Sequence, residues 1–310
     1  MTAPWIEVLQ KFVPAEIAGH DLQTMFYNSI NASRRDLSIF VFTNRQAQPR
    51  WVIRCHHDRD IVQRQFTALQ ALERAQCDCQ PVALGETTFD DLYALLLRFC
   101  EGKPFSPDMI LKNRVELDRV MATLVQIQSA LANGVSQQMT AHAQITLADL
   151  QRQNDLDSEA LRLRLEHAVD LIQQLRLPML PQHSDFVWAN LLHDRRRVII
   201  IDWEHVAFLS LPFFDVWTLL LSLLHNFSVE SFQQLFHPSP LSATAIYALQ
   251  NYAQKLGIPV SPARDLFPLA LVGFIALNKR QNRNFLAGKL TRLLEFYLAN
   301  ADTFLPGDLH

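Results

Sequence analysis

Glycine is scarce in this sequence, which has only 8 glycines among 310 residues. An average protein has about 7% glycine, and here none lies between Gly19 and Gly85. The Walker A loop and the dinucleotide-binding fingerprint each need several glycines within a few positions of one another. The sequence therefore excludes both of these glycine-rich ways of holding phosphate.

Cysteine is also rare, and its spacing is uninformative for metal binding. The four cysteines are all in the first third of the chain and never form a paired CxxC spacing. Cys77 and Cys79 are too isolated for a structural zinc site, and the same spacing argues against a disulfide framework. A reducing cytoplasm is the expected location.

Neither charge nor hydropathy points to nucleic acid or to a membrane. Lys plus Arg is 28 against 31 for Asp plus Glu, which gives a net charge of -3 and lacks the basic excess that binding to a phosphate backbone requires. The longest apolar region, from Pro212 to Phe227, is interrupted by Asp215 and His225. We therefore expect no nucleic-acid partner, no signal peptide and no membrane span.

Apolar residues are plentiful, because they make up 49% of the chain, and 20 residues are phenylalanine. This composition predicts a globular protein with a large core, and the length suits two compact lobes. The first hundred residues read as a β-β-β-α-β-β pattern of short β-prone segments around one amphipathic segment. The predicted strands are Thr24 to Ile30, Leu37 to Thr43, Trp51 to Arg54, Pro81 to Leu84 and Tyr93 to Phe99, with a helix from Asp58 to Glu73.

Beyond a change in composition at Glu101 to Pro104, the pattern becomes that of long amphipathic helices. We therefore predict an α+β protein with an N-terminal lobe over residues 1–98 and a helical C-terminal lobe over 99–310. The predicted helices are Lys112 to Leu131, Ser158 to Leu175, Ala243 to Leu256, Ala263 to Asn278 and Asn284 to Ala299.

One polar segment interrupts these helices. It has Asp185 and Asn190 in a loop, followed by a predicted hairpin whose second strand ends at Asp202. Two carboxylates and one carboxamide brought together in this way offer the oxygen ligands that a hard cation with phosphate prefers. Phosphoryl transfer needs a metal on the phosphates and a carboxylate that positions the acceptor. The order Asp, Asn, strand, Asp matches that chemistry.

The segments His183 to Asn190 and Val198 to Glu204 resemble the aminoglycoside phosphotransferase and choline kinase family. Asp215, in the segment Leu211 to Asp215, matches an aspartate of that family that braces the catalytic loop. The resemblance is weaker in the first lobe, where it covers Val52 to Arg54, Arg64 to Leu69 and Leu95 to Gly102.

The resemblance implies a two-lobed protein-kinase-like fold, with a small antiparallel-sheet N-lobe that binds nucleotide. The larger, mainly helical C-lobe is implied to hold the catalytic loop and the acceptor site. It further implies that Asp185 orients or deprotonates the acceptor hydroxyl and that Asn190 and Asp202 hold Mg²⁺. His183 and Asp215 are implied to support the loop.

On the nucleotide side the sequence departs from the family twice. Arg54 stands where the family has a phosphate-contacting lysine, and Gln65 stands where it has the glutamate that pairs with that lysine. The turn containing Ser33 replaces the expected glycine-containing phosphate loop, and Leu97 and Phe99 match the linker that touches the adenine. Arginine can grip phosphate bidentately, but its planar fork differs in shape from an ammonium group.

The function that the resemblance implies is transfer of phosphate from ATP or GTP to a hydroxyl of a small molecule, of sugar or amino-alcohol type. The alternative is a nucleotide-binding pseudokinase that regulates a partner protein, which Arg54 and Gln65 favour. The intact set of Asp185, Asn190 and Asp202 favours the enzyme. Glu204, beside Asp202, favours a neutral or cationic acceptor.

Overall fold

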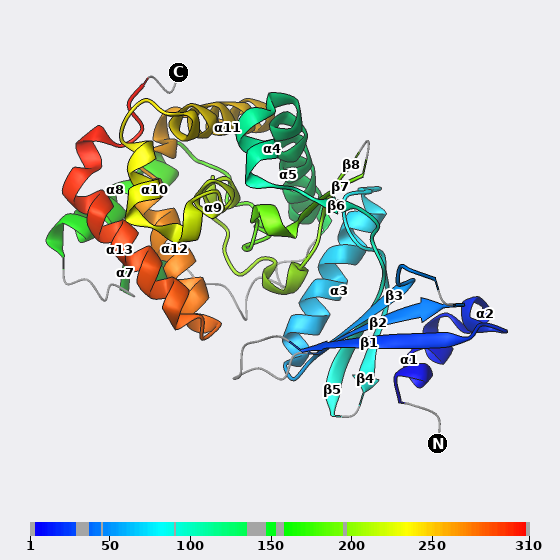
Figure 1. Ribbon diagram of the computed structural model, residues 1–310. Helices are drawn as coiled ribbons and strands as arrows, with labels where there is room; N and C mark the ends of the chain where they lie inside the picture. The colour runs from blue at the N-terminus through cyan, green and yellow to red at the C-terminus, as the bar shows by residue number, and fades with distance from the viewer. Residues whose placement is uncertain are drawn as a thin grey trace.

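The computed structural model describes residues 4–28, 37–44, 46–89, 91–134, 147–152, 158–194 and 197–307. A sheet with flanking helices is followed by a larger helical body, and the two lie side by side (Figure 1). This arrangement confirms the predicted α+β class, with an antiparallel sheet in the N-terminal part and helices in the C-terminal part. A boundary after residue 98 stays a prediction.

The main sheet has five strands in the order β1-β2-β3-β5-β4, and all neighbours are antiparallel. The fourth strand is longer than its apolar residues predicted, because its second half is polar and lies at the sheet edge, where no apolar alternation is needed. The strands are β1 (Leu22–Asn28), β2 (Leu37–Thr43), β3 (Trp51–His56), β4 (Ala83–Phe89) and β5 (Leu92–Arg98).

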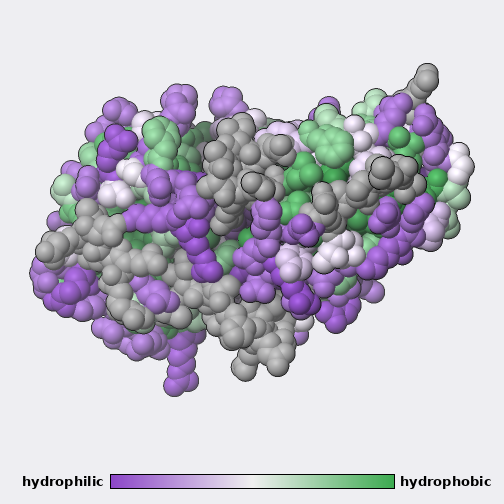
Figure 2. Space-filling model, turned by 90° about the horizontal axis from the view of Figure 1, so that it is seen from below, coloured by the Kyte–Doolittle hydropathy of each residue, from purple (hydrophilic) through white to green (hydrophobic). Residues whose placement is uncertain are grey.

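Two N-terminal helices that the sequence analysis did not predict, α1 (Pro4–Phe12) and α2 (Pro14–Ile17), cover one face of this sheet. Leu9 is fully buried against it, and a Cβ added at Gly85 would lie 2.2 Å from the ring of Phe12. Glycine at this position therefore permits the close approach of α1 to β4. Viewed from below, the sheet side of the molecule shows apolar areas between polar ones (Figure 2), and the exposed apolar residues of β1 are Met25, Phe26 and Tyr27.

On the other side of the sheet, α3 (Arg59–Arg74) lies between the sheet and the helical body (Figure 1). Asp58, where the helix was predicted to begin, caps its first turn by accepting a hydrogen bond from the Asp60 amide at 2.9 Å. Val62 and Leu69 belong to a hydrophobic core that continues into the helical body. The polar residues on this helix are thereby held at the junction of the two lobes.

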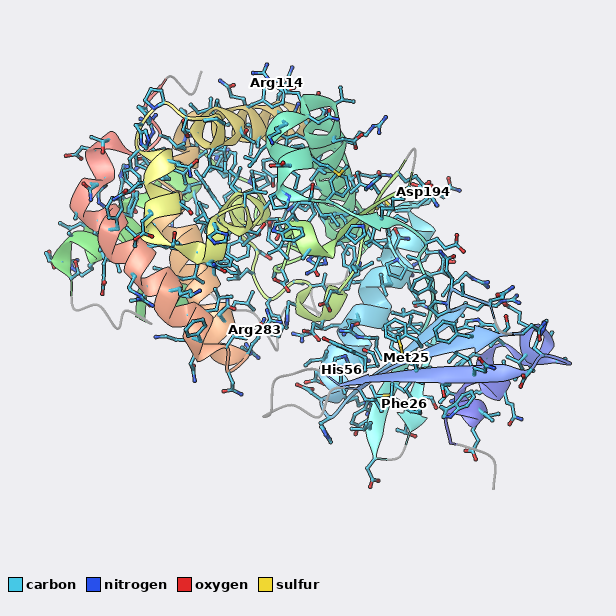
Figure 3. All side chains as sticks on the ribbon, viewed as in Figure 1. Met25, Phe26, His56, Arg114, Asp194 and Arg283 are labelled. Carbon is cyan, nitrogen blue, oxygen red and sulfur yellow. The ribbon has the colours of Figure 1, made fainter. Side chains whose placement is uncertain are left out.

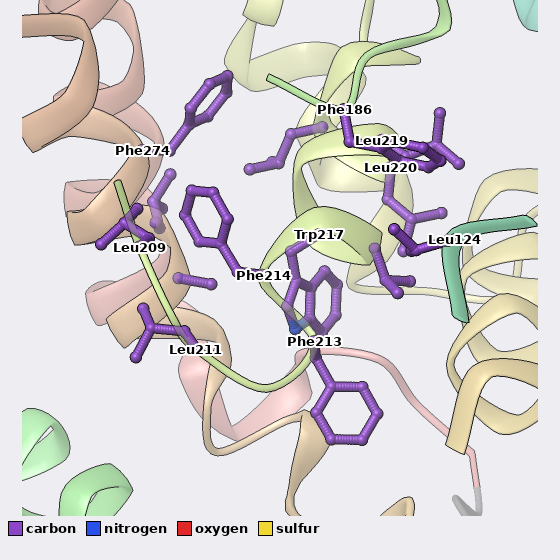
Figure 4. Packing of buried hydrophobic residues seen from close by; sticks show 14 of the residues in the cluster. Leu124, Phe186, Leu209, Leu211, Phe213, Phe214, Trp217, Leu219, Leu220 and Phe274 are labelled. Carbon is purple, nitrogen blue, oxygen red and sulfur yellow. The ribbon is translucent and has the colours of Figure 1, made fainter. Parts of the chain in front are cut away.

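The helical body is built around α9 (Phe214–Ser222), whose residues up to Leu221 are all buried. Figure 4 shows its Trp217 and Phe214 surrounded by other apolar side chains. The longest apolar region of the sequence is thus a core helix, and no helix among the described residues has the length and apolar character to cross a membrane. The other helices are α4 (Pro107–Lys112), α5 (Arg114–Gly134), α7 (Leu147–Arg152), α8 (Glu159–Gln174), α10 (Val229–Phe232), α11 (Pro240–Leu256), α12 (Phe267–Arg280) and α13 (Asn284–Asn300).

A second, small sheet joins the two lobes. It consists of β6 (Lys103–Pro104), β7 (Leu191–Asp194) and β8 (Arg197–Ile200), and the last two form the predicted hairpin. The amide of Ile200 also donates a hydrogen bond to the carbonyl of Cys79 at 2.7 Å. The hairpin therefore fixes the loop before it and the segment after it relative to the main sheet.

Candidate active site

Asp215, at the start of α9, anchors the loop that carries Asp185. Its two carboxylate oxygens accept hydrogen bonds from the backbone amides of His183 at 2.8 Å and Ser184 at 3.0 Å. Ser184 has a φ of +68°, a left-handed conformation that costs a non-glycine residue of order 1–3 kcal/mol. Burial raises the pKa of Asp215 to about 7, against the effect of these hydrogen bonds. Its carboxylate holds the loop in a turn that Ser184 would not adopt by itself.

His183 links the loop to the segment after the hairpin. Its Nε2 atom lies 3.1 Å from the carbonyl oxygen of Ile201, and its ring packs edge-on against Trp203 at 4.7 Å between centroids. Burial lowers the pKa of His183 to about 4. The imidazole is therefore neutral near pH 7 and serves to position the backbone next to Asp202.

Asp185 and Asn190 are held together at the mouth of the loop. The carboxamide nitrogen of Asn190 donates to the backbone carbonyl of Asp185 at 2.9 Å and approaches its carboxylate at 3.3 Å. With the nitrogen so engaged, the Asn190 carbonyl oxygen faces away from Asp185, an orientation assigned from the hydrogen-bond network. Burial raises the pKa of Asp185, while the charge of Arg283 opposes that rise.

Asp202 follows the hairpin with a φ of +64°, a conformation that Asp tolerates better than most residues. Its Oδ1 atom accepts a hydrogen bond from Arg54 Nη2 at 2.9 Å, and Glu204 Oε2 lies 3.5 Å from the same nitrogen. Burial by itself would raise the pKa of Glu204, but His205 and Arg54 hold it below its ordinary value. The third strand of the main sheet and the segment after the hairpin are thereby joined by an ion pair.

A cavity of about 320 Å³ extends from these residues between the two lobes, within the size range of small-molecule pockets. One face of the main sheet forms one wall of the cavity. Three lining residues, Phe40, Val52 and Leu97, pair in register on neighbouring strands of that face. Met25 on β1 pairs in turn with Phe40. The cavity is lined by Phe40, Val52, Arg54, Gln65, Leu69, Pro81, Leu97, Arg98, Phe99, Cys100, Gly102, Asn190, Leu192, Ile201, Asp202 and Trp203.

The cavity brings together most of the residues that the sequence indicated for nucleotide and metal. Arg54, Gln65, Leu97 and Phe99 line it together with Asn190 and Asp202, whereas Ser33 lies outside the described residues. The Gln65 carboxamide nitrogen is 3.5 Å from His56 Nε2. Whether Gln65 also supports Arg54, as the sequence predicted, stays a prediction.

Sequence reasoning missed several residues of the site. Phe40 and Val52 face the cavity in alternation along β2 and β3, so the strand period could have found them once the face was known. Arg283 Nη1 lies 3.8 Å from Asp185 Oδ2, and it comes from the turn between α12 and α13. Figure 3 shows Arg283 where that turn approaches the sheet. No local signal links this turn to the catalytic loop.

The donor set fits a magnesium ion that also binds phosphate. The described residues contain no cluster of three or more His, Cys, Asp or Glu able to cage a metal. Mg²⁺, however, is commonly held by one or two protein oxygen ligands together with phosphates and waters. Asn190 and Asp202 both line the cavity, and the amide of Ile201, next to Asp202, donates to the backbone carbonyl of Asn190 at 3.0 Å.

A family model described as "Phosphotransferase enzyme family" matches residues 30–254 of the chain. This range includes the whole catalytic loop, the hairpin and α9. Among curated proteins, no sequence matches this one.

Solved structures share the fold at low sequence identity. An ethanolamine kinase of Plasmodium vivax superposes with a TM-score of 0.59 and 12% identity over 94% of this chain and 86% of that one. A thermostable mutant of aminoglycoside phosphotransferase APH(4)-Ia, in ternary complex with AMP-PNP and hygromycin B, superposes with a TM-score of 0.53. Its sequence identity is 13%, and the match covers 93% of this chain and 98% of that one. The gentamicin complex of APH(2")-IIa gives 0.51 and 15% over 95% and 96%. At these identities the likeness shows the fold alone.

Proposed function

Because this chain belongs to the phosphotransferase enzyme family, we propose that it transfers the γ-phosphate of ATP to a hydroxyl group of a small molecule. The observation that carries the proposal is that Asn190 and Asp202 line a largely apolar cavity together with Arg54, while the Asn190 carboxamide lies 3.3 Å from the Asp185 carboxylate. Phosphoryl transfer depends on positioning and on charge stabilisation, and these four residues supply groups for both.

The proposed place of the nucleotide follows from the residues that line the cavity. The apolar side chains of Val52, Leu97 and Phe99 suit the flat adenine ring. Arg54, with Asp202 beside it, suits the phosphates. One of the solved structures with this fold binds AMP-PNP, which agrees with a nucleotide in this place. GTP in this cavity would have to place its base and its phosphates against the same residues.

Magnesium is proposed as the cofactor, with Asn190 and Asp202 as its protein ligands. Bound there, it would neutralise charge on the β- and γ-phosphates. Arg54 is already hydrogen-bonded to Asp202 at 2.9 Å, so its guanidinium reaches the same place from the sheet. We infer that Arg54 contacts the phosphates in the role that an ammonium group plays in related kinases.

Asp185 is proposed to take the acceptor proton. The acceptor oxygen attacks the γ-phosphorus, the bond from that phosphorus to the bridging oxygen of ADP breaks, and the hydroxyl proton passes to the Asp185 carboxylate. Asn190 keeps that carboxylate in place through its hydrogen bonds. The raised pKa of Asp185 favours this step, because a base works best with a pKa nearer the operating pH.

The test is Asp185→Asn, which preserves volume and removes the basic oxygen. Consumption of ATP would be followed with sugars, amino-alcohols, polyols and their acidic derivatives, and ADP affinity by calorimetry. We expect turnover to fall by roughly 100-fold to 10,000-fold while ADP affinity stays within a few-fold. The matched control is Asp194→Asn at the exposed hairpin tip, where Asp194 pairs with Arg197 at 2.9 Å. Turnover within a few-fold of the wild type in Asp185→Asn would remove Asp185 from this role.

A second candidate function, nucleotide binding without transfer, is favoured by the ion pair of Arg54 with Asp202. In this ion pair the guanidinium of Arg54 already contacts the carboxylate of Asp202, which we propose as a metal ligand. The same assay separates the two candidates, because a regulatory protein would bind ADP but consume no ATP with any acceptor. The cytoplasmic location and the absence of a nucleic-acid partner remain predictions.

A further inference from the structure

Arg283 places a positive charge where the acceptor must bind. Its Nη1 atom lies 3.8 Å from Asp185 Oδ2, and about a third of its side chain is exposed, at 30%. The acceptor hydroxyl, whose proton Asp185 is proposed to take, must come within hydrogen-bond distance of the same carboxylate. Any acceptor therefore meets the Arg283 guanidinium within a few ångströms of the reacting oxygen.

Two further arginines lie close to this turn and share one aromatic ring. The guanidinium carbons of Arg64 and Arg280 are 3.9 Å and 4.6 Å from the centroid of the Phe208 ring. Arg64 comes from α3 in the N-terminal part, whereas Arg280 ends α12 in the helical body. Like charges brought this close repel each other, and an anion nearby would relieve that repulsion.

The charge on Arg64 is only partly compensated. The residue is 6% exposed, and its Nε and Nη1 atoms have no hydrogen-bond partner among the described residues. Burial and Arg280 lower the pKa of Arg64 to about 10, while Asp58 and Asp60 act in the opposite direction. A buried guanidinium with unpaired donors is costly, so the site favours a ligand that brings negative charge.

The carboxylate of Glu204 is already engaged by other groups. Glu204 is engaged by His205 at 2.9 Å and by Arg54 at 3.5 Å. From 267 to 294 the sequence of the α12–α13 segment has no acidic residue, so any anionic partner of its cations comes from another element. Because its charge is paired in this way, Glu204 attracts a cationic acceptor less strongly than the sequence argument assumed, and that argument stays a prediction.

We propose that the acceptor of this enzyme carries an anionic group, a phosphate or a carboxylate, which binds to Arg283 and Arg280 while its hydroxyl meets Asp185. The inference rests on the proposed phosphotransfer function. The short distance from Arg283 to Asp185 implies that only a few bonds separate the hydroxyl from the anionic group. Arg64 adds positive potential from behind the Phe208 ring and does not need to touch the acceptor.

The experiment compares glycerol 3-phosphate, glycerate, glycerol and ethanolamine, which are short hydroxyl compounds that differ in charge. Binding to the full chain is measured by calorimetry in excess ADP, so that the nucleotide phosphates already occupy Arg54. We expect at least one of the two anionic probes to bind roughly tenfold or more tightly than glycerol and ethanolamine, as expected for a charge-assisted hydrogen bond. Tighter binding of ethanolamine, or no measurable binding of either anion, would overturn the proposal.

Variants connect that binding to the arginines. Arg283→Gln and Arg280→Gln should each weaken the anionic probe by roughly tenfold and leave glycerol unchanged. The matched control is Lys289→Gln, because Lys289 lies on α13 but donates to the carbonyl of Asn226 at 2.9 Å. An anion that binds equally well to both arginine variants would also overturn the proposal.

ADP affinity, measured separately, distinguishes the two hypotheses. If ADP fails to bind, the phosphotransfer function is wrong, whereas the anion titration of the arginine variants still decides the charge of the acceptor site. If ADP binds and ATP is consumed only with neutral or cationic acceptors, the enzyme function stands and the anionic-acceptor proposal fails.

Discussion

Replacing Asp215 by Asn tests whether a single buried carboxylate sets the geometry of the catalytic loop. Asp215 is 1% exposed and accepts hydrogen bonds from His183 N–H at 2.8 Å, Ser184 N–H at 3.0 Å and the Gln128 carboxamide at 3.3 Å. An Asn of the same shape keeps one acceptor oxygen and turns an NH₂ group toward a donor. At least one buried donor then loses its partner.

The expected loss of stability is about 1–3 kcal/mol, the cost of one unsatisfied buried donor. Urea unfolding at pH 6, below the pKa of about 7 for Asp215, measures it as a lower midpoint at an unchanged slope, because at that pH the cost of burying a charged carboxylate does not offset the loss. Turnover should fall by about 100-fold, because a displacement of about 1 Å at a reacting group has that effect. ADP affinity should change little, since Asp215 does not line the cavity proposed for the nucleotide.

The matched control is Asp118→Asn on α5. Asp118 Oδ1 accepts from Tyr247 at 2.7 Å and from Asn251 at 2.8 Å, and an Asn side chain keeps an oxygen for both. Neither stability nor turnover should change much in that control. If Asp215→Asn behaved like the control in both assays, the anchoring role of Asp215 would be refuted.

Two further predictions concern the nucleotide and pH. Arg54→Ala should raise the dissociation constant for ATP, measured by calorimetry with Mg²⁺, by roughly tenfold or more; an unchanged constant would show that the phosphates do not reach Arg54. His183 has a pKa of about 4 against an ordinary 6.5, so the native state resists protonation and its contribution to stability is full above pH 6.5 and is lost as the pH falls toward 4. This difference between the two pKa values corresponds to about 3 kcal/mol in the free energy of unfolding. Between pH 7 and pH 4 the wild type should therefore lose about that much more stability than His183→Asn in urea titrations, and parallel pH profiles would contradict it.

The local sequence determined several elements of this fold, because interactions between residues close in the chain decide strand alternation, helix capping and hairpin formation. The alternation of apolar residues predicted β2 from Leu37 to Thr43 with the bounds that the structure has. The helices predicted to begin at Asp58 and Ser158 do start there, because both side chains cap the helix by accepting a hydrogen bond from its first turn. The hairpin after Asn190 followed from a β-branched run and a polar turn.

Other local features needed more than periodicity. The helix predicted to begin at Lys112 is interrupted at Asn113, whose side chain caps the next helix by accepting from the amides of Val115 and Glu116. Helix α1 was missed, because it is short and is stabilised by packing on the sheet through Leu9 and Phe12. A short amphipathic helix has little stability of its own, so its sequence signal is weak.

The motif order predicted a candidate site of Asp185, Asn190 and Asp202 around the hairpin, and a hairpin necessarily brings its two ends together. The role of these residues stays a prediction. Only the tertiary structure decided what surrounds them. Arg54 is 148 positions from Asp202 and Arg283 is about a hundred from Asp185, yet ion pairs join both pairs. Contacts between such distant residues depend on how the sheet, α3 and the α12–α13 turn pack together. Local propensity carries no information about that packing, so the positive charge beside Asp185 could not be predicted from the sequence.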